Sequence, residues 1–501
     1  MFNSHRLAAA CMVLLVQAAP AMAQQAASRD EFFWLGEINK ASAVINTEEG
    51  LLDKALAPRI AAGISKVLKD GSQPGGKRPP TVITFEPLLI EAVGVEATLL
   101  HAGRSSQDMI ATYRAAMLRD DLLNLAEQLN KTSGAVLRLA DKHRNTIVPN
   151  YTNGVAAQPN SLGHYLLGHA AALDRHTQRV REAYARVDRS AMGTTVLNGT
   201  SWPLNRTRMA TYLGFAAIVD NAYDASQISS QEHPVEVGGI VASVALQVGN
   251  YVEDVMTQYA QPRPWMLLEE GGGNTYVSSA MPQKKNPGLL NTTRSDASTA
   301  VTLAIGPIIQ SHNIPPGMSD AKNPRANGAM VNSAIKALSG WEKILNSLVI
   351  SPERALEELN NDWTASQELA DVLMRKYKLP FRVGHHFASE VVDYAKEKNI
   401  RPTDFPYAEA QRIYREAVKA SGPQALPMSE AEFRATLDPV AIVNNRATVG
   451  GPQPAEMERM LAGSNAKLAL QEAYVKQARS RIAASLAKLD QDFDRLLPAA
   501  K

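Results

Sequence analysis

The longest uninterrupted helical pattern in this 501-residue chain runs from residue 109 to about residue 143. Apolar side chains recur there at spacings of three, four or seven residues, namely at Leu118, Leu122, Leu125, Leu129, Val136 and Leu139. This spacing places them on one stripe of an α-helix. Other long segments with few helix breakers are residues 161–187, 235–259, 289–309, 329–348 and 465–496. Helices of this length predict a mainly α fold built around a helical bundle.

Breaker-rich stretches separate these segments and mark candidate boundaries. They lie at residues 70–80, 146–159, 262–287, 313–324 and 423–427. Strand patterns are scarce, and no repeat or zinc pattern is present. The three glycines at 271–273 lack the strand and helix that flank a phosphate-binding loop, so we interpret them as part of a mobile loop.

The N-terminus has the pattern of a secretory signal peptide. His5 and Arg6 precede an apolar stretch that is too short to cross a bilayer, and Ala21-Met22-Ala23 follows as a cleavage site. We therefore expect residues 1–23 to be removed, and the mature protein to be periplasmic or secreted. The single cysteine, Cys11, lies in this segment, so the mature chain would contain no thiol for a disulfide, a nucleophile or a metal site.

The charge balance excludes one large class of partner. The 52 lysines and arginines nearly equal the 50 aspartates and glutamates, whereas nucleic-acid binding usually needs a basic surface. The sequence therefore predicts no nucleic-acid partner, and no membrane contact after signal removal. A negatively charged substrate would have to be bound by a few local cations.

One segment carries a specific motif. Residues 278–287 read Ser-Ser-Ala-Met-Pro-Gln-Lys-Lys-Asn-Pro. This closely resembles the signature of the argininosuccinate lyase/fumarase/aspartase superfamily. Residues 101–108 resemble the first substrate loop of the argininosuccinate lyases, and residues 151–164 resemble the second. Similar matches at 198–215, 379–386 and 437–451 extend the resemblance over nearly the whole mature chain.

The resemblance implies a fold and an assembly. It predicts an N-terminal helical domain at 24–115, a central bundle domain at 116–378 and a C-terminal helical domain at 379–501. Members of this superfamily usually form tetramers in which the bundles join into a twenty-helix core, and each active site takes loops from three chains. We therefore expect a homotetramer with shared sites that binds a small carboxylate substrate and needs no metal or organic cofactor.

The motif also implies roles for its residues. Elimination next to a carboxylate needs a base for a weakly acidic Cβ–H, and a serine can act only if cations and backbone N–H groups stabilise its alkoxide. By resemblance Ser278 would be this base, on a lid that excludes water. Lys284 and Asn286 would hold the substrate carboxylate as its charge grows. The remaining expected substrate contacts are Ser105, Gln107, Thr152, Asn153, Gln158, Ser279, Met281, Asn323 and Arg325.

Several positions depart from the argininosuccinate lyase pattern. Asn153 replaces a histidine that helps to protonate the leaving group, and asparagine cannot deliver a proton, so the general acid is unassigned. His101, His164 and His169 are nearby in sequence, but each fits a structural role better. Ser106 replaces an arginine that would grip a carboxylate.

A second set of departures affects the residues that would recognise the distal part of the substrate. A tyrosine, a glutamine and a lysine of the family are replaced here by Met318, Asn323 and Ala326. Lys322 and Arg325 are the nearby charged residues. In the signature motif, Val277 replaces the glycine that normally precedes the base. Argininosuccinate is therefore not the expected substrate.

The favoured function is a lyase that releases fumarate or a similar unsaturated acid from an N- or O-substituted succinate. One alternative is a cycloisomerase of the carboxymuconate type, because some of these also lack the histidine. The other is a non-catalytic carboxylate-binding homologue. The intact Ser278, Met281, Lys284 and Asn286 argue against the latter.

Overall fold

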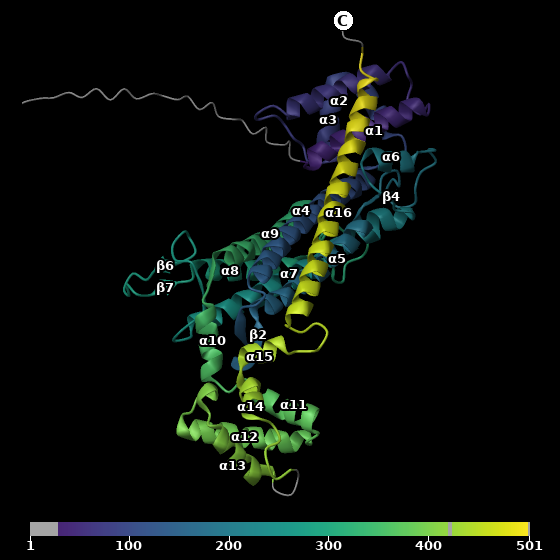
Figure 1. Ribbon diagram of the computed structural model, residues 1–501. Coiled ribbons are helices and arrows are strands. Elements are labelled where there is room, and N and C mark those ends of the chain that lie inside the picture. Colours follow the sequence, from purple (N-terminus) through teal and green to yellow (C-terminus); the bar gives the residue numbers. More distant parts are fainter. Residues whose placement is uncertain (1–28, 419–422, 499–501) are drawn as a thin grey trace, which may run out of the picture.

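Five long helices form the centre of the molecule. The structure, a computed structural model, describes residues 29–418 and 423–498. The bundle helices are α4 (Ser106–Lys142), α5 (Leu162–Val187), α7 (Ser229–Tyr259), α8 (Gly288–Ser311) and α9 (Pro324–Ser347). They lie side by side, with α4 against α5 and α9, and α8 against α7 and α9 (Figure 1). The expected mainly α fold with a central bundle is confirmed.

The helical segments predicted from apolar spacing correspond to these elements. The pattern at 109–143 is α4, whose leucine stripe is buried, with Leu122, Leu125 and Leu129 fully enclosed. Three segments begin earlier than expected. Helix α9 begins at Pro324 rather than at residue 329, and α16 (Pro454–Asp494) begins at Pro454 rather than at residue 465. Helix α7 begins at Ser229 rather than at residue 235, after a short π-helical turn, η2 (Asp224–Ile228). Pro234 lies inside α7, in its second turn. A proline in sequence usually marks a helix boundary, but α7 continues through this one.

The N-terminal helices pack on one end of the bundle. They are α1 (Glu31–Glu48), α2 (Ala57–Gly71), α3 (Val82–Val93) and the 3₁₀ helix η1 (Val95–His101). Helix α1 is buried along most of its length, with Trp34, Leu35 and Ile38 fully enclosed. Their core is continuous with that of the bundle.

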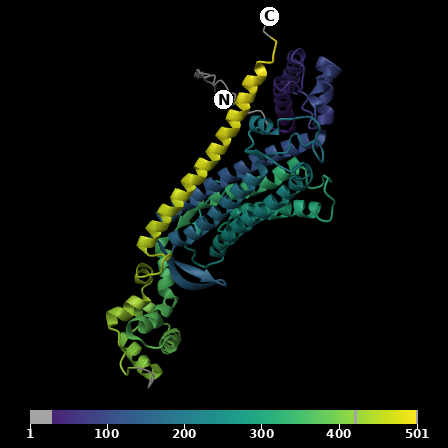
Figure 2. The ribbon, with the colours of Figure 1, turned by 90° about the vertical axis from the view of Figure 1, so that its right-hand side faces the viewer.

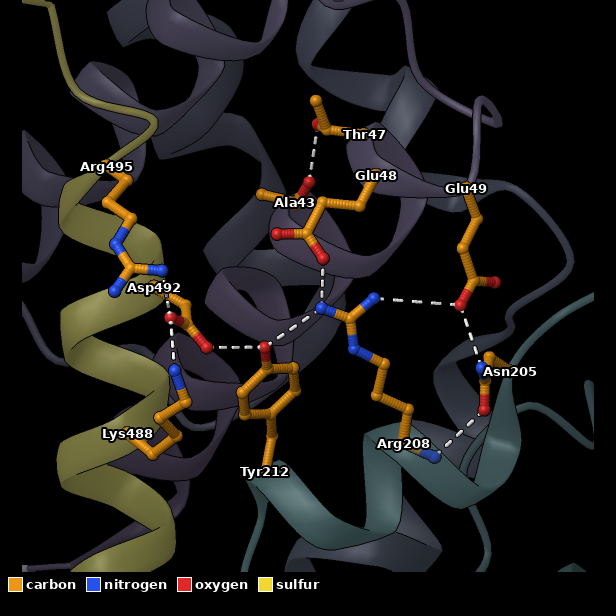
Figure 3. Close-up of polar contacts among 10 residues, drawn as sticks. All are labelled: Ala43, Thr47, Glu48, Glu49, Asn205, Arg208, Tyr212, Lys488, Asp492 and Arg495. Carbon is orange, nitrogen blue, oxygen red and sulfur yellow. Dashed lines mark hydrogen bonds and ion pairs between the residues drawn. The ribbon is translucent and has the colours of Figure 1, made fainter.

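The last helix, α16 (Pro454–Asp494), returns along the whole bundle and ends beside α1 (Figure 2). Polar contacts join its end to α6 (Arg206–Tyr212) and α1, as Figure 3 shows. The hydroxyl of Tyr212 donates to Asp492 on α16 at 2.7 Å, and Lys488 and Arg495 also contact that carboxylate. Arg208 donates to the Tyr212 hydroxyl and pairs with Glu48 of α1. Helix α6 therefore connects α1 and α16, the first and last helices of the described chain.

A smaller group of helices at the other end has a separate core. It contains α11 (Ser366–Tyr377), α12 (Phe381–Lys398), η3 (Pro402–Asp404), α13 (Tyr407–Val418) and α14 (Glu430–Leu437). Helices α10 (Pro352–Asn361) and α15 (Pro439–Asn444) lie between this group and the bundle and contact the β1–β2 pair. The buried residues of the smaller group run from Trp363 to Leu437, with Phe387, Phe405 and Phe433 at the centre. The domain boundaries expected from the sequence stay predictions.

Strands in the described part of the chain form four short pairs. These are β1 (Ile147–Thr152) with β2 (Val155–Ser161), β3 (Arg189–Ser190) with β4 (Ala217–Ile218), β5 (Met266–Leu268) with β8 (Leu348–Ile350), and β6 (Tyr276–Val277) with β7 (Lys285–Asn286). All are antiparallel except β3 with β4. Two of these pairs, β1–β2 and β6–β7, carry candidate site residues.

One segment of the described chain, Asp224–Tyr259, is apolar and long enough to cross a membrane, with a mean hydropathy of 1.3 in its most apolar window. More than half of that window, 56%, is buried inside the molecule, so packing in the bundle accounts for its character. The expected signal peptide at 1–23 lies outside the described residues.

Candidate active site

The signature motif folds as a hairpin that projects from the bundle (Figure 1). Tyr276 pairs with Asn286, and Val277 pairs with Lys285. The backbone N–H of Ser278 donates to the carbonyl of Lys284 at 3.0 Å, which closes the turn between the two strands. The three glycines before the hairpin all have positive φ, between 58° and 86°, a conformation that most residues with a side chain avoid. The glycines therefore set the path by which the hairpin leaves the bundle.

Ser278 lies where two backbone donors converge. Its Oγ accepts the N–H of Met281 at 3.3 Å and that of Ala280 at 3.4 Å. The serine is partly exposed, so a substrate can reach it. Because N–H donors favour the charged form of an acceptor, this turn is suited to stabilising an alkoxide. The arrangement matches the need predicted for a serine base.

The two lysines of the motif have different surroundings. Lys285 pairs with Glu270 at 3.5 Å. Lys284 is exposed, and within the described residues its ammonium group forms no ion pair. Asn286 donates from Nδ2 to the carbonyl of Tyr276 at a long 3.4 Å. Lys284 is therefore the cation of this hairpin that is available to a carboxylate. Ser279 and Met281 are exposed on the same turn.

The second substrate loop is the turn of the β1–β2 hairpin. Thr152 pairs with Val155, which leaves Asn153 and Gly154 as a two-residue turn. Both have positive φ, 53° and 77°, as a type I′ turn requires. Asparagine tolerates this conformation better than most residues do, so the turn gives a structural reason for Asn153. The breaker-rich sequence here predicts a loop, although Asn-Gly between extended segments is a strong hairpin signal.

The other expected contact on this hairpin is Gln158. Its amide donates to Gln367 of α11 at 2.6 Å, so it connects the hairpin to the smaller helical group. Thr152 and Asn153 are exposed at the tip.

The first substrate loop is the start of α4. Ser105 is the N-cap of that helix, and its Oγ accepts the N–H of Gln107 at 3.3 Å. Asp108 completes a capping box and also accepts the N–H groups of Gly193 and Thr195, each at 3.0 Å. Ser105 thus caps the helix, a role that the Ser-x-x-Asp pattern indicates. The Gln107 side chain is exposed and is free to contact a substrate.

Asn323 likewise caps a helix. Its Oδ1 accepts the N–H groups of Arg325 and Ala326 at the start of α9, both at 3.1 Å. Arg325 contacts Glu31 of α1 at 3.1 Å. These two expected substrate contacts therefore have intramolecular partners.

The three histidines near the loops also have structural surroundings. His164 contacts the carbonyl of Gly450 at 2.8 Å, and His101 lies 3.3 Å from Glu86. His169 is enclosed by aromatic rings, and burial lowers its pKa. None of them is placed at the turn of either hairpin.

The expected site residues lie at two ends of the helical bundle. Helix α4 has 37 residues and is therefore about 55 Å long. Gln107 is at the start of α4. Asn323 precedes α9 and lies beside the first third of α4, because Gly328, slightly further along α9, faces Asp121 of α4. Both hairpins are at the far end. Within the described residues no hydrogen bond or ion pair joins the hairpins to each other or to the first loop. One chain does not bring these residues together.

The sequence and fold resemble known lyases along nearly the whole chain. Residues 16–301 match the family described as "Lyase", and residues 363–444 match "Argininosuccinate lyase C-terminal". An argininosuccinate lyase of Methanosarcina acetivorans is 26% identical over 464 residues, which are 92% of this chain and 91% of that relative. EDDS lyase in complex with formate aligns with a TM-score of 0.83 and 26% identity, over 93% of this chain and 92% of that chain. An EDDS lyase variant with bound fumarate gives the same TM-score and coverage at 27% identity.

Proposed function

This chain is a lyase of the argininosuccinate lyase branch of the fumarase/aspartase superfamily, and on that premise we propose that it performs anti β-elimination on a succinate-type substrate. The bond broken is C–N or C–O, and the product is fumarate or a similar unsaturated acid. The observation that carries the proposal is the β6–β7 turn, where two N–H groups point at Ser278 Oγ and Lys284 is available beside it.

In the proposed reaction, the Ser278 alkoxide takes the proton from Cβ of the substrate. The electron pair left on carbon moves into the neighbouring carboxylate, and Lys284 and Asn286 stabilise the resulting double negative charge. The pair then returns to form the double bond, the C–N or C–O bond breaks, and the leaving atom takes up a proton. The relatives favour this elimination over the cycloisomerase and non-catalytic alternatives.

A product assay tests the proposal. Purified protein is incubated with N-substituted aspartates, malate and argininosuccinate, and the ultraviolet absorbance of the new double bond is followed. We expect a rise with at least one N-substituted aspartate and none with argininosuccinate. A protein that binds these acids without releasing any unsaturated product contradicts the proposed elimination, and a lactone product points to the cycloisomerase.

We also propose that the active site is shared among the chains of a homotetramer. Support comes from the distance between the two groups of site residues, about 55 Å along α4. In addition, α7 and α8 expose apolar side chains, with Leu246 59%, Ile308 49% and Ile309 68% exposed, and such a patch suits burial against other copies.

Subunit mixing tests the shared site. Ser278→Ala and Gln107→Ala affect opposite ends of the bundle, so each variant alone should lose activity. Tetramers reassembled from both should regain part of it, because some sites then take both loops from intact copies. If differently tagged subunits co-purify as mixed tetramers and activity stays absent, the loops do not come from different chains.

Export remains a separate proposal. The charged start, the short apolar stretch and the Ala21-Met22-Ala23 site support cleavage after Ala23. Sequencing the N-terminus of the exported protein tests it, and an intact Met1 on protein outside the cytoplasm would contradict it.

A further inference from the structure

One tyrosine hydroxyl connects the turn of the β1–β2 hairpin to three other parts of the molecule. Tyr151 directly precedes Thr152 at that turn, and its side chain is half-buried. The hydroxyl donates to Oε1 of Glu358 on α10 and accepts the Nε1–H of Trp265 at 3.2 Å. A longer bond, 3.5 Å, comes from Nε2 of Gln258 on α7. The hydroxyl therefore acts as donor and as acceptor at once.

The groups around this hydroxyl are held together without the hairpin. Trp265 is 5% exposed and Gln258 is 2% exposed. The backbone N–H of Trp265 donates to Oε1 of Gln258 at 3.3 Å, and its carbonyl accepts the N–H of Ser351, the N-cap of α10, at 2.8 Å. Burial and the contact with Glu358 raise the pKa of Tyr151 to about 12, so the hydroxyl keeps its proton. Helices α7 and α10 thus form a fixed frame to which Tyr151 binds.

The rest of the turn has no such contact. Within the described residues, no side-chain hydrogen bond or ion pair joins residues 152–157 to another part of the chain. The pairing of β1 with β2 shifts register between Asn150 and Tyr151, as at a β-bulge, and such a shift bends a strand. Gln158, on the opposite strand, adds one bond to Gln367. On the β1 side, the direction of the turn therefore depends on Tyr151.

A cavity of about 330 Å³ lies under the turn. It has the turn on one side and the end of α7 on the other, and its lining includes Asn153, Gly154, Asp254, Thr257 and Gln261. Protein interiors are otherwise closely packed, so the turn is not fixed against α7 by contact and has space to move towards it.

We propose that Tyr151 is a positioning residue, whose hydroxyl holds Thr152 and Asn153 where they meet the substrate. This inference rests on the proposed elimination, in which the second loop contacts the substrate. Without the hydroxyl the turn occupies several positions over the cavity, and only a fraction of the molecules can bind. The apparent affinity falls by that fraction. Bound substrate selects the correct position, so turnover at saturation is retained.

Tyr151→Phe tests the proposal because it removes the hydroxyl and keeps the ring. With the N-substituted aspartate that gives the fastest rise in the product assay, we expect KM to rise about 10-fold and kcat to stay within about threefold. Deuterium exchange at the backbone amides of residues 152–157 should become faster in the same variant. A KM equal to that of the wild type, or unchanged exchange at the turn, overturns the proposal.

Tyr259→Phe is the matched control. Tyr259 is also a half-buried tyrosine of this region, and its hydroxyl accepts the backbone N–H of Leu268 at 3.0 Å, away from the hairpin. A general loss of stability would appear in both variants, whereas KM and the exchange of residues 152–157 should change only in Tyr151→Phe. Equal changes in the two variants show that Tyr151 has no specific effect on the turn.

Glu358 allows the contact to be removed from the other side, without a change in the hairpin. Glu358→Ala leaves the hydroxyl without its charged acceptor, so KM should rise about fivefold or more. Glu358→Gln keeps an oxygen that accepts the hydroxyl, and its KM should stay within about twofold of the wild type. The side chain is partly exposed, so both variants should fold even if Tyr151→Phe does not. Wild-type KM in Glu358→Ala contradicts the assignment.

Deuterium exchange separates this inference from the proposed function. If the wild-type protein forms no unsaturated product from any N-substituted aspartate, the proposed reaction fails. Faster exchange confined to Tyr151→Phe and Glu358→Ala then still shows that the hydroxyl holds the turn. If product forms and Tyr151→Phe keeps the wild-type KM, the elimination stands and the positioning role fails.

Discussion

Replacing Ser278 with alanine is expected to lower kcat by about 10²- to 10⁴-fold, the usual contribution of a general base, with little change in melting temperature. The side chain accepts two N–H groups at 3.3 and 3.4 Å, in a turn that is exposed to solvent. Water can replace the lost hydroxyl as the acceptor for both donors, so folding loses little. The reaction, by contrast, loses the group that takes the Cβ proton. Steady-state kinetics and thermal unfolding of the same samples measure the two effects.

Ser279→Ala is the matched control for this prediction. The neighbouring serine is exposed on the same turn, but the two N–H groups converge on Ser278. Its loss should therefore reduce kcat far less. If both variants keep wild-type turnover, another base acts; if Ser279→Ala is the more damaging, the two serines have been assigned in the wrong order.

The bundle could be predicted from sequence because its signal is local. Leu122, Leu125 and Leu129 repeat with helical spacing, and each is buried where that spacing placed it. The start of α7 could not be placed in the same way, since Pro234 is tolerated inside a helix that tertiary packing stabilises.

The residues of the candidate site were predictable by motif, but their local roles were not. Ser105 and Asn323 were expected to contact substrate, and the structure shows that each caps a helix. Cap patterns consist of one or two short polar residues, and such residues also suit substrate binding, so the sequence alone does not separate the roles.

Arg119→Met should lower the stability of the protein by about 3–5 kcal/mol, the usual cost of breaking a buried ion pair. The Arg119 guanidinium is fully buried and donates to Asp188 at 3.1 Å and to the carbonyls of Leu213 and Gly214. Methionine fills much of the same space but leaves those acceptors without their donor. Asp188 would keep its contact with Arg481 of α16, which limits the loss. Thermal or urea unfolding measures the change.

The control for Arg119 joins the same two long helices at the surface. Arg479 of α16 pairs with Glu127 of α4, and both side chains are more than a third exposed. An exposed pair of this kind contributes about 0–1 kcal/mol, so Arg479→Met should barely move the transition. If the two variants lose the same amount of stability, a buried and an exposed contact between α4 and α16 contribute equally, which contradicts the prediction. A loss confined to Arg119→Met would instead locate the stabilisation at Asp188, where α4 and α16 are joined through the segment that follows α5.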